Sequence, residues 1–383
     1  MSRIALGFHL HLPHRLRSFR YFDIGRQLNY CDDAVTSALL SQMLAVSWRP
    51  ALDALAVGVA GVDRDFRFYL ALSGTLLDQL AVWAPQELDR LRRLSDSGKV
   101  EFVITTASQS LAALHAPEEF LVQARSQRDR LSTVFGQPSS TFRNTAPLSD
   151  AGTARSLDKE GFRAVLAPAH ARLLGWRKAQ RPFAAAPCPN LRVLPCDLRL
   201  AALFGGQTGV AGALPTLDHF IAALSGADSH SDGFCLDLPL LAFSGHGVDG
   251  QGGFDFLRAI CAAVPERTPF RWALPGELSS GAVVASVSAP ATISAESPTC
   301  DASPWIGSGL QRDAFDTLYA LEDRVRAAGD QALASIWRTL QDATYLREMD
   351  PSTAQPGATP AGASPYDAYM SFMNILSDLE SRL

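Results

Sequence analysis

The sequence has no excess of positive charge, because 34 Lys and Arg residues stand against 39 Asp and Glu residues and give the 383 residues a net charge of −5. No stretch of the chain gathers basic residues into a stripe. Proteins that hold nucleic acid or anionic membranes through charge need such a surface. We therefore expect neither nucleic acid nor a membrane as a partner, and the sequence does not indicate a protein partner.

Long uncharged apolar runs are also missing. None reaches the roughly 18 residues of a membrane-spanning helix without an interrupting Gly, Pro or Ser. Residues 1–10 contain Arg3 and His9, a pattern typical of a first strand rather than of a signal peptide. The uncharged stretch 201–217 is rich in glycine and contains a proline, which predicts a loop.

Cysteine is scarce and scattered. The six cysteines form no CxxC pair and no Cys/His group with zinc spacing, so we expect reduced thiols in a cytoplasmic protein. His9, His11 and His14 lie within six residues, but no acidic or cysteine partner stands at ligand spacing. We therefore interpret these histidines as the polar lip of a substrate site, and we expect neither a metal nor another cofactor.

Strand-like and helix-like segments alternate over the first 270 residues or so. This order favours a parallel sheet or a β/α barrel, and six or seven units in that length fit a barrel. A doubly wound sheet is the alternative, although no glycine-rich phosphate loop follows the first strand. The predicted strands are 3–10, 66–72, 100–104, 140–142, 162–166, 191–194 and 234–238, and the main predicted helices are 32–48 (ended by Pro50), 85–97, 117–135, 150–160, 216–225 and 253–264.

The pattern changes in the last quarter of the chain. We predict a β/α domain over residues 1–275, a linker rich in Ser, Ala and Pro over 276–304 with one or two edge strands, and an all-helical domain over 305–383. Helices are expected at about 310–328, 330–344 and 365–383. The low-complexity stretch 351–363 is interpreted as a mobile loop.

A polar stretch follows the predicted strand 140–142. Arg143 and Asn144 are placed to reach into a site, because β/α folds carry their chemistry at the carboxyl ends of strands. Residues 145–147 (Thr-Ala-Pro) offer no group that exchanges a proton in ordinary chemistry. Asp150 starts the next helix, and we interpret it as a helix cap rather than as a catalytic acid.

Several motifs, taken in order, resemble one family. The chain is similar to glycoside hydrolase family 57, in particular to its short α-amylase-like group, along nearly its whole length. The matching segments are residues 9–17 (HLHLPHRLR, resembling H-x-H-Q-P-Y-R-L-R), 22–25 (FDIG, resembling F-F-D-I-G), 142–145 (FRNT, resembling F-R-N-T-E), 174–177 (LGWR), 243–246 (FSGH, resembling F-G-E-H), 305–307 (WIG) and 364–369 (SPYDAY).

The resemblance implies a distorted seven-stranded β/α barrel followed by a helical bundle. It also implies action on α-glucans with retention of configuration, by hydrolysis or glucan transfer. The family's nucleophile is the Glu of F-R-N-T-E, and its acid/base is the Asp that begins D-Y-E-T-F-G-E-H. In this chain the first position is Ala146, and alignment on Phe243 and His246 places the second on Pro239.

The loss of both carboxylates decides the functional prediction. A retaining glycosidase needs one carboxylate as nucleophile and another as acid/base, roughly 5 Å apart. General acid–base assistance alone contributes a rate factor of about 10²–10⁴. We therefore expect a catalytically degenerate protein that binds α-glucan or a maltooligosaccharide, or that regulates α-glucan metabolism.

Two alternatives stay open. The first is an active retaining hydrolase or 4-α-glucanotransferase with relocated carboxylates, in which Asp237 serves as acid/base under a shifted alignment. The second is an interaction protein without a sugar site. Glu101 matches a family position, and we expect it near the barrel floor.

Six residues occupy positions that resemble sugar-site positions of the family. An aromatic face together with bidentate donors suits a polyol. The other interpretation is that these residues now serve only the fold. The predicted substrate-binding residues are His11, Arg15, Arg143, Asn144, Trp176 and His246.

Overall fold

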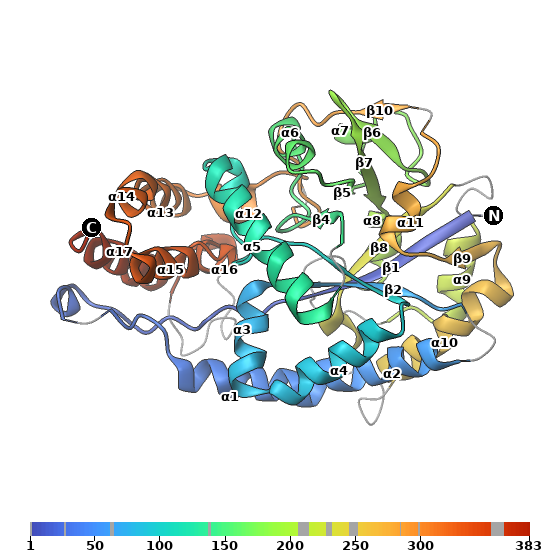
Figure 1. Ribbon diagram of the computed structural model, residues 1–383, viewed down its shortest axis with the longest axis horizontal. Helices are drawn as coiled ribbons and strands as arrows, with labels where there is room; N and C mark the ends of the chain where they lie inside the picture. The colour runs from blue at the N-terminus through green and yellow to red at the C-terminus, as the bar shows by residue number, and fades with distance from the viewer. Residues whose placement is uncertain are drawn as a thin grey trace.

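The computed structural model describes residues 2–26, 28–61, 65–136, 139–205, 214–226, 232–244, 252–283, 285–297, 299–353 and 364–383. A nearly closed barrel of parallel strands forms its centre (Figure 1). This confirms the predicted barrel and excludes the doubly wound sheet. The barrel strands are β1 (Ser2–Leu10), β2 (Phe68–Leu72), β3 (Val100–Val103), β4 (Thr141–Arg143), β5 (Ala164–Pro168), β7 (Cys188–Cys196) and β8 (Phe234–Pro239).

Two joins in the barrel are thin. β8, β1, β2 and β3 pair along continuous registers, and so do β4, β5 and β7. Between these two groups, β3 meets β4 only at the bridge between Ile104 and Phe142, and β7 meets β8 only at Cys196 and Cys235. Ordinary ladder hydrogen bonds are therefore few at these two places.

Side chains fill the barrel interior. The Tyr69 ring lies against Gly7, where a Cβ atom would fall 1.9 Å from the ring, so only glycine fits this close approach. At the amino end of the strands, α11 (Pro275–Ser279) buries Leu278 in the interior. Glu101 accepts hydrogen bonds there from Ser139, Thr141 and the Gly276 N–H, so its carboxylate holds the barrel floor together.

Helices surround the barrel, and polar caps begin many of them. Ser73, Asp150 and Thr216 each accept a backbone N–H of the helix that follows, and the cap at Asp150 was predicted. These helices are α1 (Asp33–Met43), α2 (Arg49–Ala60), α3 (Gly74–Trp83), α4 (Pro85–Asp96), α5 (Pro117–Phe135), α6 (Ala151–Lys159), α7 (Ala171–Leu174), α8 (Leu198–Ala202), α9 (Leu217–Ser225) and α10 (Gly252–Arg267), with short turns η1 (Tyr21–Asp23), η3 (Ala112–Leu114) and η5 (Leu240–Phe243).

The prediction that Pro50 ends the first helix was wrong. A π-helical turn, η2 (Leu44–Trp48), joins α1 to α2, and Pro50 follows it directly, so the widened turn accommodates the proline and the helical run continues. The continuous helical run Asp33–Ala60 has the length and composition of a membrane span, with a mean hydropathy of 1.3 over its best window. Half of that window is buried in the protein, and buried core helices share this signature.

Three short strands lie beside the barrel, and two of them lie where no strand was predicted. β6 (Phe183–Ala185) runs antiparallel to β7, β10 (Ser286–Val287) pairs with β6, and β9 (Phe270–Trp272) pairs with the start of β1. Of these, β10 falls in the segment 276–304 for which edge strands were expected. Runs of two or three residues carry too little periodicity to be recognised in a sequence.

The chain ends in a helical region beside the carboxyl ends of the strands (Figure 1). The predicted helix 310–328 is divided at Leu321, and the predicted helix 330–344 ends at Leu340. The predicted boundaries at residues 275 and 304 stay predictions. Residues 206–213 of the predicted loop 201–217 and residues 354–363 of the predicted loop 351–363 lie outside the described residues. The helical region contains α12 (Ser303–Ile306), α13 (Gly309–Ala320), α14 (Glu322–Ala328), α15 (Gln331–Leu340), α16 (Ala343–Glu348), η6 (Pro351–Thr353) and α17 (Pro365–Glu380).

Candidate functional site

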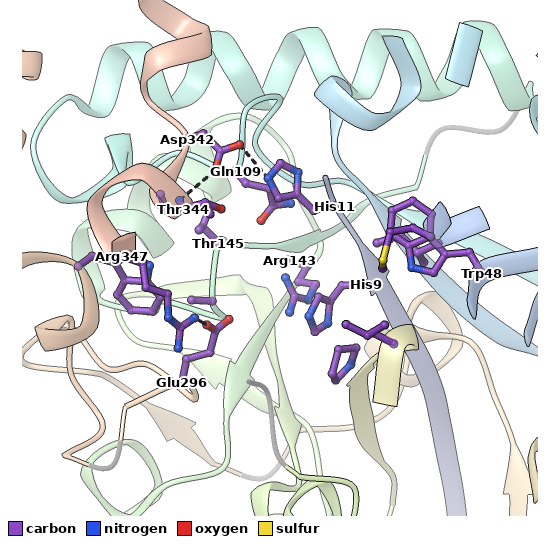
Figure 2. A pocket seen from close by; sticks show the side chains of 17 residues that line it. His9, His11, Trp48, Gln109, Arg143, Thr145, Glu296, Asp342, Thr344 and Arg347 are labelled. Atoms are coloured by element: carbon purple, nitrogen blue, oxygen red, sulfur yellow. Dashed lines mark hydrogen bonds and ion pairs between the residues drawn. The ribbon is translucent and has the colours of Figure 1, made fainter. Parts of the chain in front are cut away.

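A cavity of about 230 Å³ opens at the carboxyl ends of the barrel strands. Its walls come from the barrel, from the segment 276–304 and from the helical region, as Figure 2 shows. Ala146 and Pro239, the two positions at which the family resemblance predicts the loss of a carboxylate, both line it. The side chains that matter below are His9, His11, Trp48, Gln109, Arg143, Ala146, Pro239, Glu296, Trp305, Asp342 and Arg347.

A buried polar cluster forms the floor of the cavity. The Arg143 Nε and Nη2 atoms each lie 2.9 Å from Asp237 Oδ2, and the Tyr69 hydroxyl donates to Asp237 Oδ1 at 3.0 Å. Arg143 and Asp237 are both only 1% exposed. Burial raises the pKa of Tyr69 well above its ordinary value, and the Asp237 charge adds to the shift, so the phenol stays a donor.

His9 completes this floor. Its Nδ1 atom lies 3.7 Å from Asp237 Oδ2. Burial lowers the pKa of His9 well below its ordinary value, and the nearby Arg143 charge lowers it further. His9 is therefore a neutral imidazole at neutral pH, and Arg143 is the cation that balances Asp237.

A second polar chain links the barrel to the helical region. His11 Nδ1 lies 2.8 Å from Ser73 Oγ, and His11 Nε2 lies 2.8 Å from Asp342 Oδ2. Asp342 Oδ1 also accepts the Thr344 N–H, which starts α16 (Figure 2). The order Ser–His–Asp matches a nucleophile triad, but Ser73 is fully buried and its Oγ accepts the Leu76 N–H. The Ser73–His11–Asp342 series of polar contacts therefore positions Asp342 and does not present a nucleophile.

The turn after β4 is held from two sides. Asn144 Nδ2 donates to the Leu148 carbonyl, and Asn144 Oδ1 accepts the Thr145 N–H, so this side chain shapes the turn and does not line the cavity. Ala146 has a φ of 52°, in the left-handed region that few alanines adopt. From the other side, Ser294 Oγ donates to the Ala146 carbonyl at 3.0 Å.

The segment 276–304 also brings a carboxylate into the cavity. Glu296 accepts from Arg347 Nη1 at 2.6 Å, and the Arg347 guanidinium lies 5.6 Å from the centre of the Trp305 ring. Burial raises the pKa of Glu296, against the opposing charges of Arg347 and Arg143.

Sequence reasoning missed Glu296, Asp342 and Arg347. Glu296 stands in a stretch with no helical or strand periodicity, so nothing local marks it. Asp342 falls within the predicted helix 330–344, and Arg347 lies just beyond it, so neither stood at a predicted strand end.

The structure disperses the six predicted substrate-binding residues. His11 and Arg143 lie at the cavity, whereas Arg15 forms an ion pair with Glu348 in a neighbouring groove. Trp176 is 90% exposed and lies elsewhere on the surface. Asn144 holds the turn described above, and His246 lies outside the described residues. Substrate binding by these six residues stays a prediction.

Trp176 stands next to a separate basic cavity. Arg177 lies 5.4 Å from the Trp176 ring centre and lines this second cavity with His170, Lys178 and Arg199. Within the part of the chain that the structure describes, no group of three or more His, Cys, Asp or Glu side chains is arranged to hold a metal ion.

Comparison with known proteins places this site in context. The family Glycosyl hydrolase family 57 matches residues 5–267. A putative alpha-amylase from Methanocaldococcus jannaschii is 22% identical over 403 residues, which cover 98% of this chain and 84% of the relative.

Solved structures of two enzymes have a similar fold. A branching enzyme of this family from Thermococcus kodakaraensis has a TM-score of 0.73 at 11% identity and covers 99% of this chain and 90% of its own. The 4-alpha-glucanotransferase from Thermococcus litoralis has a TM-score of 0.59 at 18% identity over 84% of this chain. The matched part is only 45% of that enzyme, so the present chain spans less than half its length.

Proposed function

The chain belongs to glycosyl hydrolase family 57, and on this premise we propose that it binds α-glucan at the barrel mouth without cleaving it by the retaining two-carboxylate route. The substrate class is supported by the names of the similar proteins, an alpha-amylase, a branching enzyme and a 4-alpha-glucanotransferase. The cavity suits a neutral polyol, because its cationic and anionic side chains occur together and nearly balance.

One observation carries the proposed loss of cleavage. Ala146 and Pro239, which the family resemblance equates with nucleophile and acid/base, line the same cavity. A methyl group and a pyrrolidine ring can neither attack an anomeric carbon nor transfer a proton. This arrangement supports the proposal that the site keeps its place and much of its polarity but lacks both reacting groups of the retaining mechanism.

Asp237 is a poor substitute for the acid/base. Its carboxylate is 1% exposed and lies below Pro239, in contact with Arg143 and Tyr69. A general acid must reach the glycosidic oxygen within hydrogen-bond distance, directly or through one water. Asp237 would first have to break a buried ion pair, which leaves Arg143 uncompensated. We therefore assign Asp237 a structural role.

A second candidate function rests on a different observation. Two other carboxylates, Glu296 and Asp342, do line the cavity. An inverting hydrolase needs two carboxyl groups roughly 6.5–9.5 Å apart, and it forms no covalent intermediate. Residual hydrolysis with inversion would use these two residues, each of which already has a cationic or imidazole partner in Arg347 or His11.

The test combines binding with turnover on maltooligosaccharides. A ligand that binds only the folded protein at 100 times its Kd stabilises it by about 2.7 kcal/mol, which raises the melting temperature measurably. We expect this rise together with no release of reducing sugar and no glucan transfer. Turnover by the wild type that survives in Glu296→Gln and Asp342→Asn would contradict both candidate functions.

A matched pair of variants sharpens the test. Ala146→Glu alone restores a carboxylate at the nucleophile position, and Ala146→Glu with Pro239→Asp restores both positions. If the loss of these two carboxylates explains the absence of turnover, only the double variant gains slow turnover. A wild type that neither cleaves nor is stabilised by maltooligosaccharides would favour the interaction protein without a sugar site.

A further inference from the structure

The polar groups that face into the cavity have two sources. The barrel contributes Arg143 and His9, which are engaged with the buried Asp237. The carboxylates that reach the cavity, Glu296 and Asp342, come from outside the barrel strands. A ligand in this cavity therefore meets a floor whose charges are already paired and walls that still offer carboxylate oxygens.

Backbone and side-chain hydrogen bonds fix the position of Glu296 close to the turn that contains Ala146. Ile293 and Ser149 exchange two backbone hydrogen bonds of 3.0 Å each, which attach the segment to the start of α6. Ser294 Oγ donates to the Ala146 carbonyl, and the Glu296 N–H donates to the same Ser294 oxygen. The Glu296 carboxylate therefore lies at the wall of the cavity beside the turn after β4, where Ala146 offers no carboxylate.

The Glu296–Arg347 pair offers an acceptor and a donor side by side. Arg347 Nη1 bonds to Glu296 Oε2, and a carboxylate has lone pairs on both oxygens for further partners. Arg347 carries five N–H donors in a planar fork, of which this bond uses one. Neighbouring hydroxyls of a sugar ring each donate and accept, so a carboxylate beside a guanidinium matches a vicinal diol.

The cavity has the dimensions of one sugar ring and a closed floor. Its volume of about 230 Å³ falls below the roughly 300–1,000 Å³ of pockets for drug-sized ligands. The Arg143–Asp237 pair and the Tyr69 ring fill the barrel beneath it, so a chain cannot continue through the barrel. A glucan that fills this cavity down to its floor therefore enters it with a chain end.

We propose that the cavity binds a single terminal glucose unit of an α-glucan, and that the Glu296–Arg347 pair selects this chain end through a vicinal diol. The inference rests on the proposed function, because it assumes that α-glucan is the ligand of this cavity. It adds that interior segments and cyclic glucans are excluded. Asp342, held by His11 at the start of α16, supplies a second acceptor to the cavity.

The first experiment needs no variant. Isothermal titration of the wild-type protein with maltotriose, which has chain ends, is compared with β-cyclodextrin, which has none. We expect maltotriose to bind at least tenfold more tightly than β-cyclodextrin. Equal affinity for both would overturn chain-end selection but leave glucan binding intact, whereas binding of neither would overturn the proposed function itself.

The second experiment assigns the recognition to named residues. Glu296→Gln keeps the size of the side chain and removes its charge, and we expect at least a tenfold loss of maltotriose affinity. Asp316→Asn is the matched control, because Asp316 is an exposed carboxylate on α13 and should leave the affinity unchanged. Circular dichroism confirms that both variants are folded. A folded Glu296→Gln protein with wild-type affinity would remove Glu296 from the site.

Discussion

The barrel and the part of the chain beyond residue 275 use their carboxylates differently. In the barrel, Asp237 and Glu101 are held by side chains and backbone N–H groups and stabilise the cylinder. Beyond residue 275, Glu296 and Asp342 keep an edge toward the cavity. The comparison indicates that the carboxylates that stabilise the fold and those that can contact a ligand lie on different segments of the chain.

Removal of Arg143 should have the largest effect on the barrel. Arg143→Met removes the cationic partner of the buried Asp237 carboxylate, which costs about 3–5 kcal/mol of the free energy of unfolding. Urea denaturation followed by circular dichroism measures this loss. Arg267→Ala is the control, because Arg267 and Asp218 form an exposed pair that is worth about 1 kcal/mol or less.

A double variant tests the cause of that loss. Arg143→Met with Asp237→Leu removes both charges, and we expect it to recover much of the lost stability, since no unpaired charge then remains. If the double variant is as unstable as the single one, the ion pair is not what the barrel loses.

A methyl group added in the barrel interior should cause the second-largest loss of stability. Gly7→Ala places a Cβ atom on the Tyr69 ring, and this overpacking should cost about 1–3 kcal/mol by thermal or urea unfolding. Gly309→Ala, at the start of α13, meets no atom within 4 Å and should change stability by less than about 1 kcal/mol. Equal effects of the two substitutions would mean that the interior is not close-packed at Tyr69.

The stability of the protein should depend on pH through Glu296. Because burial raises the pKa of Glu296 above 4.5 in the folded protein, the folded state holds this proton more tightly than the unfolded state. Stability therefore falls as the pH rises from about 4.5 through the folded-state pKa, by at most about 1.4 kcal/mol per pH unit. Glu296→Gln removes this contribution.

The measurement is the free energy of unfolding of wild type and Glu296→Gln between pH 4 and pH 8. The advantage of the wild type over the variant should shrink as the pH rises through that window. Other titrating groups, which both proteins share, cancel in the difference. An advantage that grows with pH would show that the Arg347 charge outweighs burial at this carboxylate.

The smallest effect is expected at Asp150. Its side chain caps α6 by accepting the Thr153 N–H, so Asp150→Ala should lose about 1 kcal/mol of stability, and Asp150→Ser should recover most of it. Glucan affinity should not change in either variant. A loss of affinity in both would place Asp150 among the ligand groups and weaken the division drawn above.

The barrel could be predicted from the sequence, but several of the side chains that line its cavity could not. Alternating apolar segments, and the helix cap at Asp150, placed most strands and helices within a few residues. Pro50 misled us, because a π-helical turn upstream lets the helix continue. The resemblance brought Ala146 and Pro239 to attention, and the structure places both on one cavity.

The ligand-facing groups could not be found in the same way. Glu296 reaches the cavity through long-range contacts of Ile293 and Ser294 with the turn after β4, and no local pattern records such contacts. Trp176 matched a motif, yet it lies exposed away from the cavity. Motif matching identifies a strand end, whereas the side chains that gather above it depend on tertiary packing.

The two thin joins of the barrel give the buried polar cluster a mechanical role. Arg143 belongs to the β4–β5–β7 group of strands, whereas Asp237 and Tyr69 belong to the β8–β1–β2–β3 group. Their bonds run across the barrel lumen and tie together two half-cylinders that share few ladder hydrogen bonds at their edges. Asp237 thus connects the two halves of the barrel, and without it the halves could separate more easily along both joins.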